Sequence, residues 1–285
     1  MEEEDVMIDT NSREIVLDIL MEILEKGNLS HLVLKQALEK YQYLEKQDRA
    51  FITRITEGTL EYLIQIDAVI NRYSKVKVNK MKPVIRTLLR MSVYQILYME
   101  RVPDSAVCNE AVKLAKKRKF QGLTGFVNGV LRNISREKES LKFASAAEEY
   151  SIPQWMFDMW EKEYGKEKAE IIAKAFLEDR PLTVRCNISL ASVEDIRKRL
   201  AAQNISSEIS TISETMLAIQ GYDYLDMVEV FAEGKVTVQD TSSSLVGVVA
   251  SPKAGDFVLD VCSAPGGKSL HVADLLDAKG HYRNN

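Results

Sequence analysis

Apolar residues recur at helical spacing, without a break, from about residue 12 to residue 135. Side chains three and four positions apart lie on one face of an α-helix, so each such stripe can be buried against another helix. The first stripe ends before Gly27, a residue type common at helix C-termini, and Pro83 suits the first turn of a later helix. This stripe comprises Ile15, Val16, Ile19, Leu20, Ile23 and Leu24. We therefore predict an all-α bundle and assign it to residues 1–138.

The pattern changes after this bundle. Residues 136–150 are charged and small with little periodicity, which is typical of a linker. Leu182, Val184 and Cys186 then alternate with polar residues, as in a half-buried strand. The other expected elements are helices at about 153–163, 167–178 and 192–203 and short strands near 207–212 and 215–220. We therefore predict a linker and a small α+β domain over residues 139–235.

The last segment, residues 236–285, has the order helix, strand, glycine loop, helix. Phe257 to Val261 form a continuous apolar run typical of a buried parallel strand, and Ser269 to Leu276 are helical. This is the first strand–helix step of a doubly wound α/β domain, whose second strand should begin at about Asn285. We therefore expect an incomplete domain in which this strand lacks parallel neighbours.

The loop between that strand and that helix allows several interpretations. Glycine permits unusual backbone angles and the close approach of a ligand, and the free N–H groups of the helix suit an anion. A phosphate-binding P-loop would end as Gly267-Lys268-Ser269 does, but its first glycine would fall at Cys262. A dinucleotide fingerprint fits in no register. A loop that binds S-adenosylmethionine and a structural turn that binds nothing both stay open from the residues alone.

Several segments resemble a known enzyme family. The loop, Cys262 to Lys268, and the upstream Val238 to Ser243 are similar to the cofactor region of RNA cytosine-5 methyltransferases. Segments of the bundle resemble the helical domain of the antitermination factor NusB: 48–51, 94–98, 102–103, 109–112 and 126–132. Residues 152–155 and 180–187 resemble the segments that follow in the RsmB (Sun, Fmu) family of 16S rRNA (cytosine-5)-methyltransferases. The domain order also matches, so the resemblance covers nearly the whole chain.

The resemblance implies a fold, a cofactor and a reaction. The fold is multidomain: an all-α NusB-like bundle, a small α+β domain and the start of a Rossmann-like α/β methyltransferase domain. The cofactor is S-adenosylmethionine, bound by Cys262, Ser263, Ala264, Pro265, Gly266, Gly267 and Lys268. The reaction methylates a cytosine of small-subunit ribosomal RNA through a covalent cysteine adduct.

In the family, the nucleophilic cysteine lies well beyond the cofactor loop, so no catalytic residue is assigned here. Cys262 is expected to pack as a small residue of the loop, and Cys108 and Cys186 match no catalytic motif. We therefore expect a truncated chain without turnover. The alternative function is a non-catalytic NusB-like module that binds RNA.

The overall charge does not favour a nucleic-acid partner, because the formal net charge is −4 and the pI about 5.6. Binding to 16S rRNA must therefore depend on local basic surface. The candidates are Lys116, Lys117, Arg118 and Lys119 in the bundle and Arg180 and Arg185 in the α+β domain. The competing interpretation of the charge run is an ordinary solvated helix face.

The remaining features exclude other classes of protein. Three scattered cysteines and three scattered histidines indicate neither a disulfide framework nor a metal site. No apolar run is long enough for a membrane span. The N-terminus, Met1 to Asp5, is acidic, which is the wrong sign for a secretory signal or presequence. We therefore expect a cytoplasmic monomer.

Overall fold

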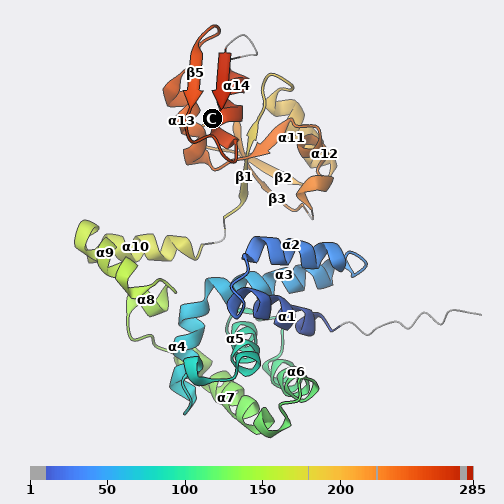
Figure 1. Cartoon of the computed structure of the whole chain (residues 1–285), viewed down its shortest axis with the longest axis vertical. Helices are drawn as coiled ribbons and strands as arrows, with labels where there is room; N and C mark the ends of the chain where they lie inside the picture. The colour runs from blue at the N-terminus through green and yellow to red at the C-terminus, as the bar shows by residue number, and fades with distance from the viewer. Residues whose placement is uncertain (1–10, 179, 223, 277–280, 285) are drawn as a thin grey trace, which may run out of the picture. The chain divides into compact units, whose positions relative to one another are not determined.

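A computed structural model describes residues 11–178, 180–222, 224–276 and 281–284. The chain divides into two compact units, the first ending at Glu178 and the second following it (Figure 1). The acidic segment from Met1 to Asp5 lies outside the described residues. The domain boundaries given above remain a prediction.

The first unit contains the predicted helical bundle. Its main helices are α1 (Ser12–Leu24), α2 (Ser30–Lys40), α3 (Lys46–Glu61), α4 (Leu63–Tyr73), α5 (Pro83–Tyr98), α6 (Asp104–Lys117) and α7 (Thr124–Glu137). Helix α5 lies at the centre and contacts α1, α3, α4, α6 and α7 (Figure 1). Its buried residues join those of its neighbours in one hydrophobic cluster, which extends along the chain from Ile15 to Ile134. The prediction of an all-α bundle is confirmed.

The predicted helix ends are also confirmed. Pro83 is the first residue of α5, as predicted. The N-cap of α1, which was not predicted, is Asn11, whose side chain accepts a hydrogen bond from the Arg13 N–H at 2.9 Å. Gly27 follows α1 with φ +76°, a conformation that glycine adopts without strain. Its N–H donates to the Ile23 carbonyl at 3.2 Å, which satisfies a carbonyl in the last turn of α1.

Residues 136–150 are more ordered than the predicted linker. They contain the single turn η3 (Lys138–Ser140) and the short helix α8 (Ala146–Glu149), which packs on α4. Ala147 is buried, and the buried Gln65 amide donates to the Glu149 carbonyl at 2.6 Å. The contact was not predictable from periodicity, because one alanine and one backbone carbonyl make no apolar stripe.

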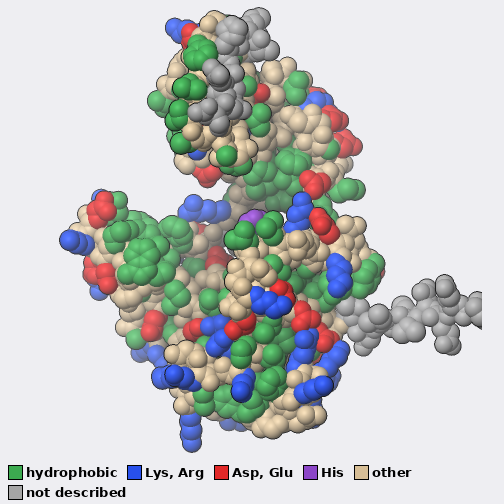
Figure 2. Space-filling view, in the orientation of Figure 1, with side chains coloured by type: hydrophobic (Ala, Val, Ile, Leu, Met, Phe, Trp, Pro, Cys, Tyr) green, Lys and Arg blue, Asp and Glu red, His purple; other side chains and the backbone are tan. Residues whose placement is uncertain are grey.

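The two predicted helices that follow are α9 (Gln154–Tyr164) and α10 (Lys166–Phe176). They belong to the first compact unit, whereas the prediction assigned them to the domain over residues 139–235. They enclose a small core of their own around Phe157, Ala169 and Ala173. Figure 2 shows hydrophobic side chains gathered over these two helices. Trp155 on α9 and Ile171 on α10 are exposed.

The second unit begins with a four-stranded antiparallel sheet. Its elements are β1 (Leu182–Cys186), α11 (Val193–Ala202), β2 (Ser206–Ile209), β3 (Met216–Gln220), α12 (Glu229–Ala232) and β4 (Val236–Val238). The strand order is β2-β3-β1-β4, which gives a βαββαβ unit with β1 and β3 in the middle. Val184 on β1 lies opposite Leu217 and Val238, and its side chain belongs to the core of this unit. The predicted α+β domain is confirmed.

Strand β4 begins at Val236, one residue after the domain boundary predicted at residue 235. It pairs with β1, so the antiparallel sheet includes residues that were assigned to the next domain. Three residues are too few to show the alternation that identifies a strand from sequence.

The last part of the second unit is an α/β step. Helix α13 (Thr241–Ala250) leads to β5 (Phe257–Asp260), the glycine loop, α14 (Gly267–Leu275) and β6 (His281–Asn284). Strand β6 pairs in parallel with β5, with Phe257 opposite His281. The α/β architecture is therefore confirmed, and two expectations are corrected. The second strand begins four residues before Asn285, and β5 has a parallel neighbour.

Within the described ranges, no helix combines the length and the apolar character needed to cross a bilayer.

Candidate functional site

The glycine loop is closed at its base by the Asp260 carboxylate. One oxygen accepts a hydrogen bond from the Cys262 N–H at 3.0 Å, and the other accepts one from the buried Ser269 hydroxyl at 2.7 Å. Asp260 ends β5 and Ser269 lies in the first turn of α14. The carboxylate therefore holds the end of the strand, the start of the loop and the start of the helix together.

Gly266 makes the turn into helix α14. Its φ is +113°, a value that side-chain-bearing residues rarely adopt, and it is the N-cap of α14. A Cβ atom added at Gly266 or Gly267 would meet no atom within 4 Å, so the space over the loop is open. The free N–H groups of the helix and the exposed Lys268 lie beside this space. Both suit the carboxylate of an amino-acid ligand.

The structure brings the predicted cofactor residues together around one pocket of about 200 Å³. Its lining includes every predicted residue of the loop except Gly266. It also includes Gln239, Asp240 and Ser243, which the sequence did not identify as site residues. Their signal was the similarity of the segment from Val238 to Ser243 to the corresponding segment of the methyltransferases.

Asp240 adds a negative charge to this pocket. Its side chain caps α13, and it accepts hydrogen bonds from the Ser242 N–H at 2.8 Å and from the Ser242 hydroxyl at 2.5 Å. These bonds, and to a smaller extent the charge of Arg180, lower the pKa of Asp240. The pocket therefore combines a carboxylate with the positive end of a helix, a pair that suits a zwitterionic ligand.

Two of the three cysteines are unsuited to act as nucleophiles. Cys108 and Cys186 are buried, and burial raises the pKa of both thiols, to about 11 for Cys186. A buried thiol that stays protonated is inert. Cys262 is exposed at the start of the loop. Across the described part of the chain, no group of three or more His, Cys, Asp or Glu residues is arranged to hold a metal ion.

The prediction that Arg185 contacts RNA is corrected by the burial of its side chain. Its side chain is 2% exposed, and its guanidinium forms an ion pair with Asp274 and donates to the Gln239 side chain at 2.8 Å. A guanidinium committed to these buried partners has no face for a phosphate. Arg180, the other candidate of this unit, is exposed.

The basic run at the end of α6 is only partly available to a ligand. Lys117 forms an ion pair with Glu14 at 2.5 Å, and Arg118 forms one with Asp18 at 2.7 Å. Lys116 and Lys119 are exposed, and neither has a carboxylate partner among the described residues. Half of the predicted run therefore carries charge that RNA could neutralise.

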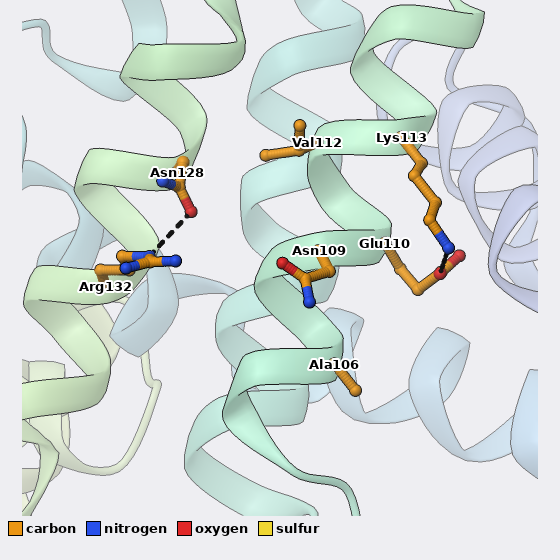
Figure 3. A pocket seen from close by; sticks show the side chains of 7 residues that line it. All are labelled: Ala106, Asn109, Glu110, Val112, Lys113, Asn128 and Arg132. Atoms are coloured by element: carbon orange, nitrogen blue, oxygen red, sulfur yellow. Dashed lines mark hydrogen bonds and ion pairs between the residues drawn. The ribbon is translucent and has the colours of Figure 1, made fainter.

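A pocket of about 500 Å³ lies between α6 and α7, and most of the residues that line it have polar side chains (Figure 3). The Arg132 guanidinium donates to the Asn128 side chain at 3.1 Å, and Lys113 pairs with Glu110 at 2.7 Å. The remaining lining residues are Ala106, Asn109 and Val112. Amides and a guanidinium can contact base edges, ribose hydroxyls and phosphates, so this pocket extends the candidate RNA surface.

Comparisons with known proteins agree with this architecture. The sequence model of the NusB family matches residues 10–136. That of the ferredoxin-like domain of RsmF/B-like methyltransferases matches residues 152–222. The chain is 36% identical, over 96% of its length, to the "Probable ribosomal RNA small subunit methyltransferase B" of Bacillus subtilis (strain 168). The chain is therefore similar, over nearly all of its length, to members of the ribosomal RNA small subunit methyltransferase B family.

A second member of the methyltransferase B family, from Synechocystis sp. (strain ATCC 27184 / PCC 6803 / Kazusa), is 30% identical over 95% of the chain. The chain spans 62% of the length of each of these two relatives. The solved structure of PH0851 has the same fold over 97% of the chain and 64% of its own length, with a TM-score of 0.74 and 24% identity.

Proposed function

We propose that this chain is part of an enzyme that methylates carbon 5 of a cytosine in small-subunit ribosomal RNA, with S-adenosylmethionine as the methyl donor. The observation that carries the proposal is the pocket at the glycine loop in a chain that is similar to methyltransferase B proteins over nearly all of its length. The first unit would bind the RNA, and the loop would bind the amino-acid end of the cofactor.

The residues of this chain fit one end of the cofactor. The N–H groups at the start of α14 and Lys268 would bind its carboxylate, and Asp240 would face its ammonium group. Bound S-adenosylmethionine supplies an activated methyl group on its sulfonium. The pocket of about 200 Å³ is smaller than the roughly 300–1,000 Å³ of typical ligand sites, so these residues form part of the site.

In the proposed reaction a cysteine thiolate adds to carbon 6 of the cytosine. Carbon 5 would then take the methyl group as its bond to the sulfonium breaks and S-adenosylhomocysteine is left. A base would remove the carbon 5 proton, and the thiolate would leave carbon 6. We assign the thiolate to none of the three cysteines here. Cys108 and Cys186 are buried, and Cys262 belongs to the loop that binds the cofactor.

Titration calorimetry of this chain with S-adenosylhomocysteine tests the loop assignment. Gly266→Val should abolish binding, because a branched side chain would fill the open space over the loop. Gly255→Val is the matched control: Gly255 also has a positive φ, +95°, and open surroundings, but lies before β5. Equal affinities for the two variants would contradict the assignment. RNA binding by a chain that binds no S-adenosylhomocysteine would favour the non-catalytic alternative.

A further inference from the structure

Arg185 lies on β1 of the antiparallel sheet, but the two groups that pair with its buried charge, Asp274 and Gln239, lie outside the strands of this sheet. Its Nη1 atom pairs with the Asp274 carboxylate on α14, and its Nε atom donates to the Gln239 side-chain oxygen at 2.8 Å. Its Nη2 atom is buried without a hydrogen-bond partner among the described residues. Burying a charge is costly unless it is paired, so Arg185 ties the sheet to α14.

Gln239 follows β4 directly and is anchored to β1 through its backbone. Its N–H donates to the Thr183 carbonyl at 3.2 Å, and its carbonyl accepts a hydrogen bond from the Thr183 hydroxyl at 2.8 Å. Its side-chain NH₂ donates to the Gly267 carbonyl at 3.2 Å. The residue is 5% exposed and lines the loop pocket. Gln239 therefore connects the antiparallel sheet to the first residue of α14.

The orientation of the Gln239 amide follows from its neighbours. A guanidinium has only donors, so the amide oxygen must face Arg185. The NH₂ group is then left for the Gly267 carbonyl, to which it donates at 3.2 Å. Arg185 thus holds α14 at two places: directly at Asp274, and through Gln239 at Gly267. Asp274 and Gly267 are seven residues apart, which is roughly 10 Å along a helix that rises 1.5 Å per residue.

We propose that Gln239, oriented by Arg185, is a positioning residue that fixes the glycine loop and the first turn of α14 for ligand binding. This inference rests on the proposed function for its ligand, S-adenosylmethionine. It makes the βαββαβ unit a structural part of the cofactor site, because the direction of the helix N-terminus depends on β1 as well as on β5.

Gln239→Glu keeps one of the two hydrogen bonds that the Gln239 side-chain amide makes and removes the other. A carboxylate keeps an acceptor for Arg185, so the buried guanidinium stays paired. It removes the donor to the Gly267 carbonyl and puts an anionic oxygen against it. Gln203→Glu is the matched control. The Gln203 side chain also donates to a backbone carbonyl, that of Met227 at 3.3 Å, and accepts from a backbone N–H, that of Glu229 at 3.1 Å, but it is absent from the lining of the loop pocket.

Hydrogen exchange and calorimetry on the 285-residue chain test the inference. In Gln239→Glu, the amides of residues 262–270 should exchange about tenfold faster, as expected for the loss of one hydrogen bond to a buried carbonyl, while β1 and β3 exchange unchanged. The affinity for S-adenosylhomocysteine should fall about tenfold. Gln203→Glu should change neither.

Equal exchange of residues 262–270 in Gln239→Glu and the unmutated chain would overturn the inference. So would faster exchange throughout the sheet, because that would show a general loss of stability. An unmutated chain that binds no S-adenosylhomocysteine would contradict the proposed function instead, and the exchange data would still decide the role of Gln239.

Discussion

Gly58 on α3 lies directly against the ring of Tyr94 on α5. A Cβ atom added at Gly58 would come 2.0 Å from Cζ of that ring. Tyr94 is 1% exposed and packs beside Tyr62 and Tyr98, whose rings stack on each other with centroids 4.1 Å apart. The ring is therefore buried between these neighbours, and the absence of a side chain at Gly58 lets α3 approach α5 this closely.

Gly58→Ala should therefore destabilise the protein although alanine favours helix. We expect a loss of about 1–3 kcal/mol, the usual cost of overpacking a core, measured by urea unfolding followed by circular dichroism. Gly129→Ala is the control, because its Cβ in α7 would meet nothing within 4 Å. That variant should gain roughly 0.5–1 kcal/mol from helix propensity. A stabilised Gly58→Ala variant would show that the two helices do not approach as described.

Removal of the unpaired charges should weaken RNA binding more than removal of the paired ones. Lys116→Gln with Lys119→Gln should lower affinity for single-stranded RNA and reduce the slope of log affinity against log salt by about 1.4, or 0.7 for each phosphate contact. Lys117→Gln with Arg118→Gln should have a smaller effect, because Glu14 and Asp18 already neutralise these charges. Filter binding across a salt series measures both. Equal losses would show that the ion pairs open when RNA binds.

The difference between paired and unpaired lysines shows where sequence reasoning stops. The stripe from Ile15 to Leu24 predicts a buried helix face because its members are neighbours on one helix. The partner of Lys117 is Glu14, 103 positions away, and that of Arg185 is Asp274, 89 positions away. No local pattern encodes such pairs. The sequence thus predicted the helices, the sheet and the loop, but not which charges are buried or neutralised.

The glycine loop, in contrast, was predictable because it is a local feature of the sequence. Residues 262–268 are contiguous, so a similar loop in other proteins can be matched residue by residue. Gln239 joins the pocket only because β4 pairs with β1, and this pairing depends on three residues. The resemblance of residues 238–243 to the methyltransferases marked this segment, but its place beside the loop appeared only in the structure.

Acid should destabilise the second unit through His271. Burial lowers the pKa of this imidazole, and the charge of Arg185 lowers it further. Below its ordinary pKa of 6.5, the unfolded chain takes up a proton that the folded chain resists. Stability from this group is therefore complete above pH 6.5 and is lost as the pH falls below it. Thermal melts of the unmutated chain and His271→Gln between pH 7.5 and 5 measure the effect. The variant should lose less stability in acid, and an identical pH dependence would contradict the role of His271.

The three thiols should react at very different rates. Exposed Cys262 should react with a thiol reagent within minutes at pH 8, whereas buried Cys108 and Cys186 should react only on unfolding. An increase to pH 9 should leave Cys186 protected, because burial raises its pKa to about 11. Mass spectrometry of alkylated peptides measures each site. Cys262→Ser should remove the fast phase, and rapid labelling of Cys186 in the folded chain would contradict its burial.

The order of the elements along the chain also has a consequence during synthesis. The core of the helical bundle ends at Ile134, and every strand of the described residues begins at or after Leu182. At roughly 5–20 residues per second, a ribosome needs about two to ten seconds to add the residues between these two points. Helical bundles close within microseconds to milliseconds once their residues are free. The nascent bundle can therefore bury its apolar surface before any strand exists that could pair with it wrongly.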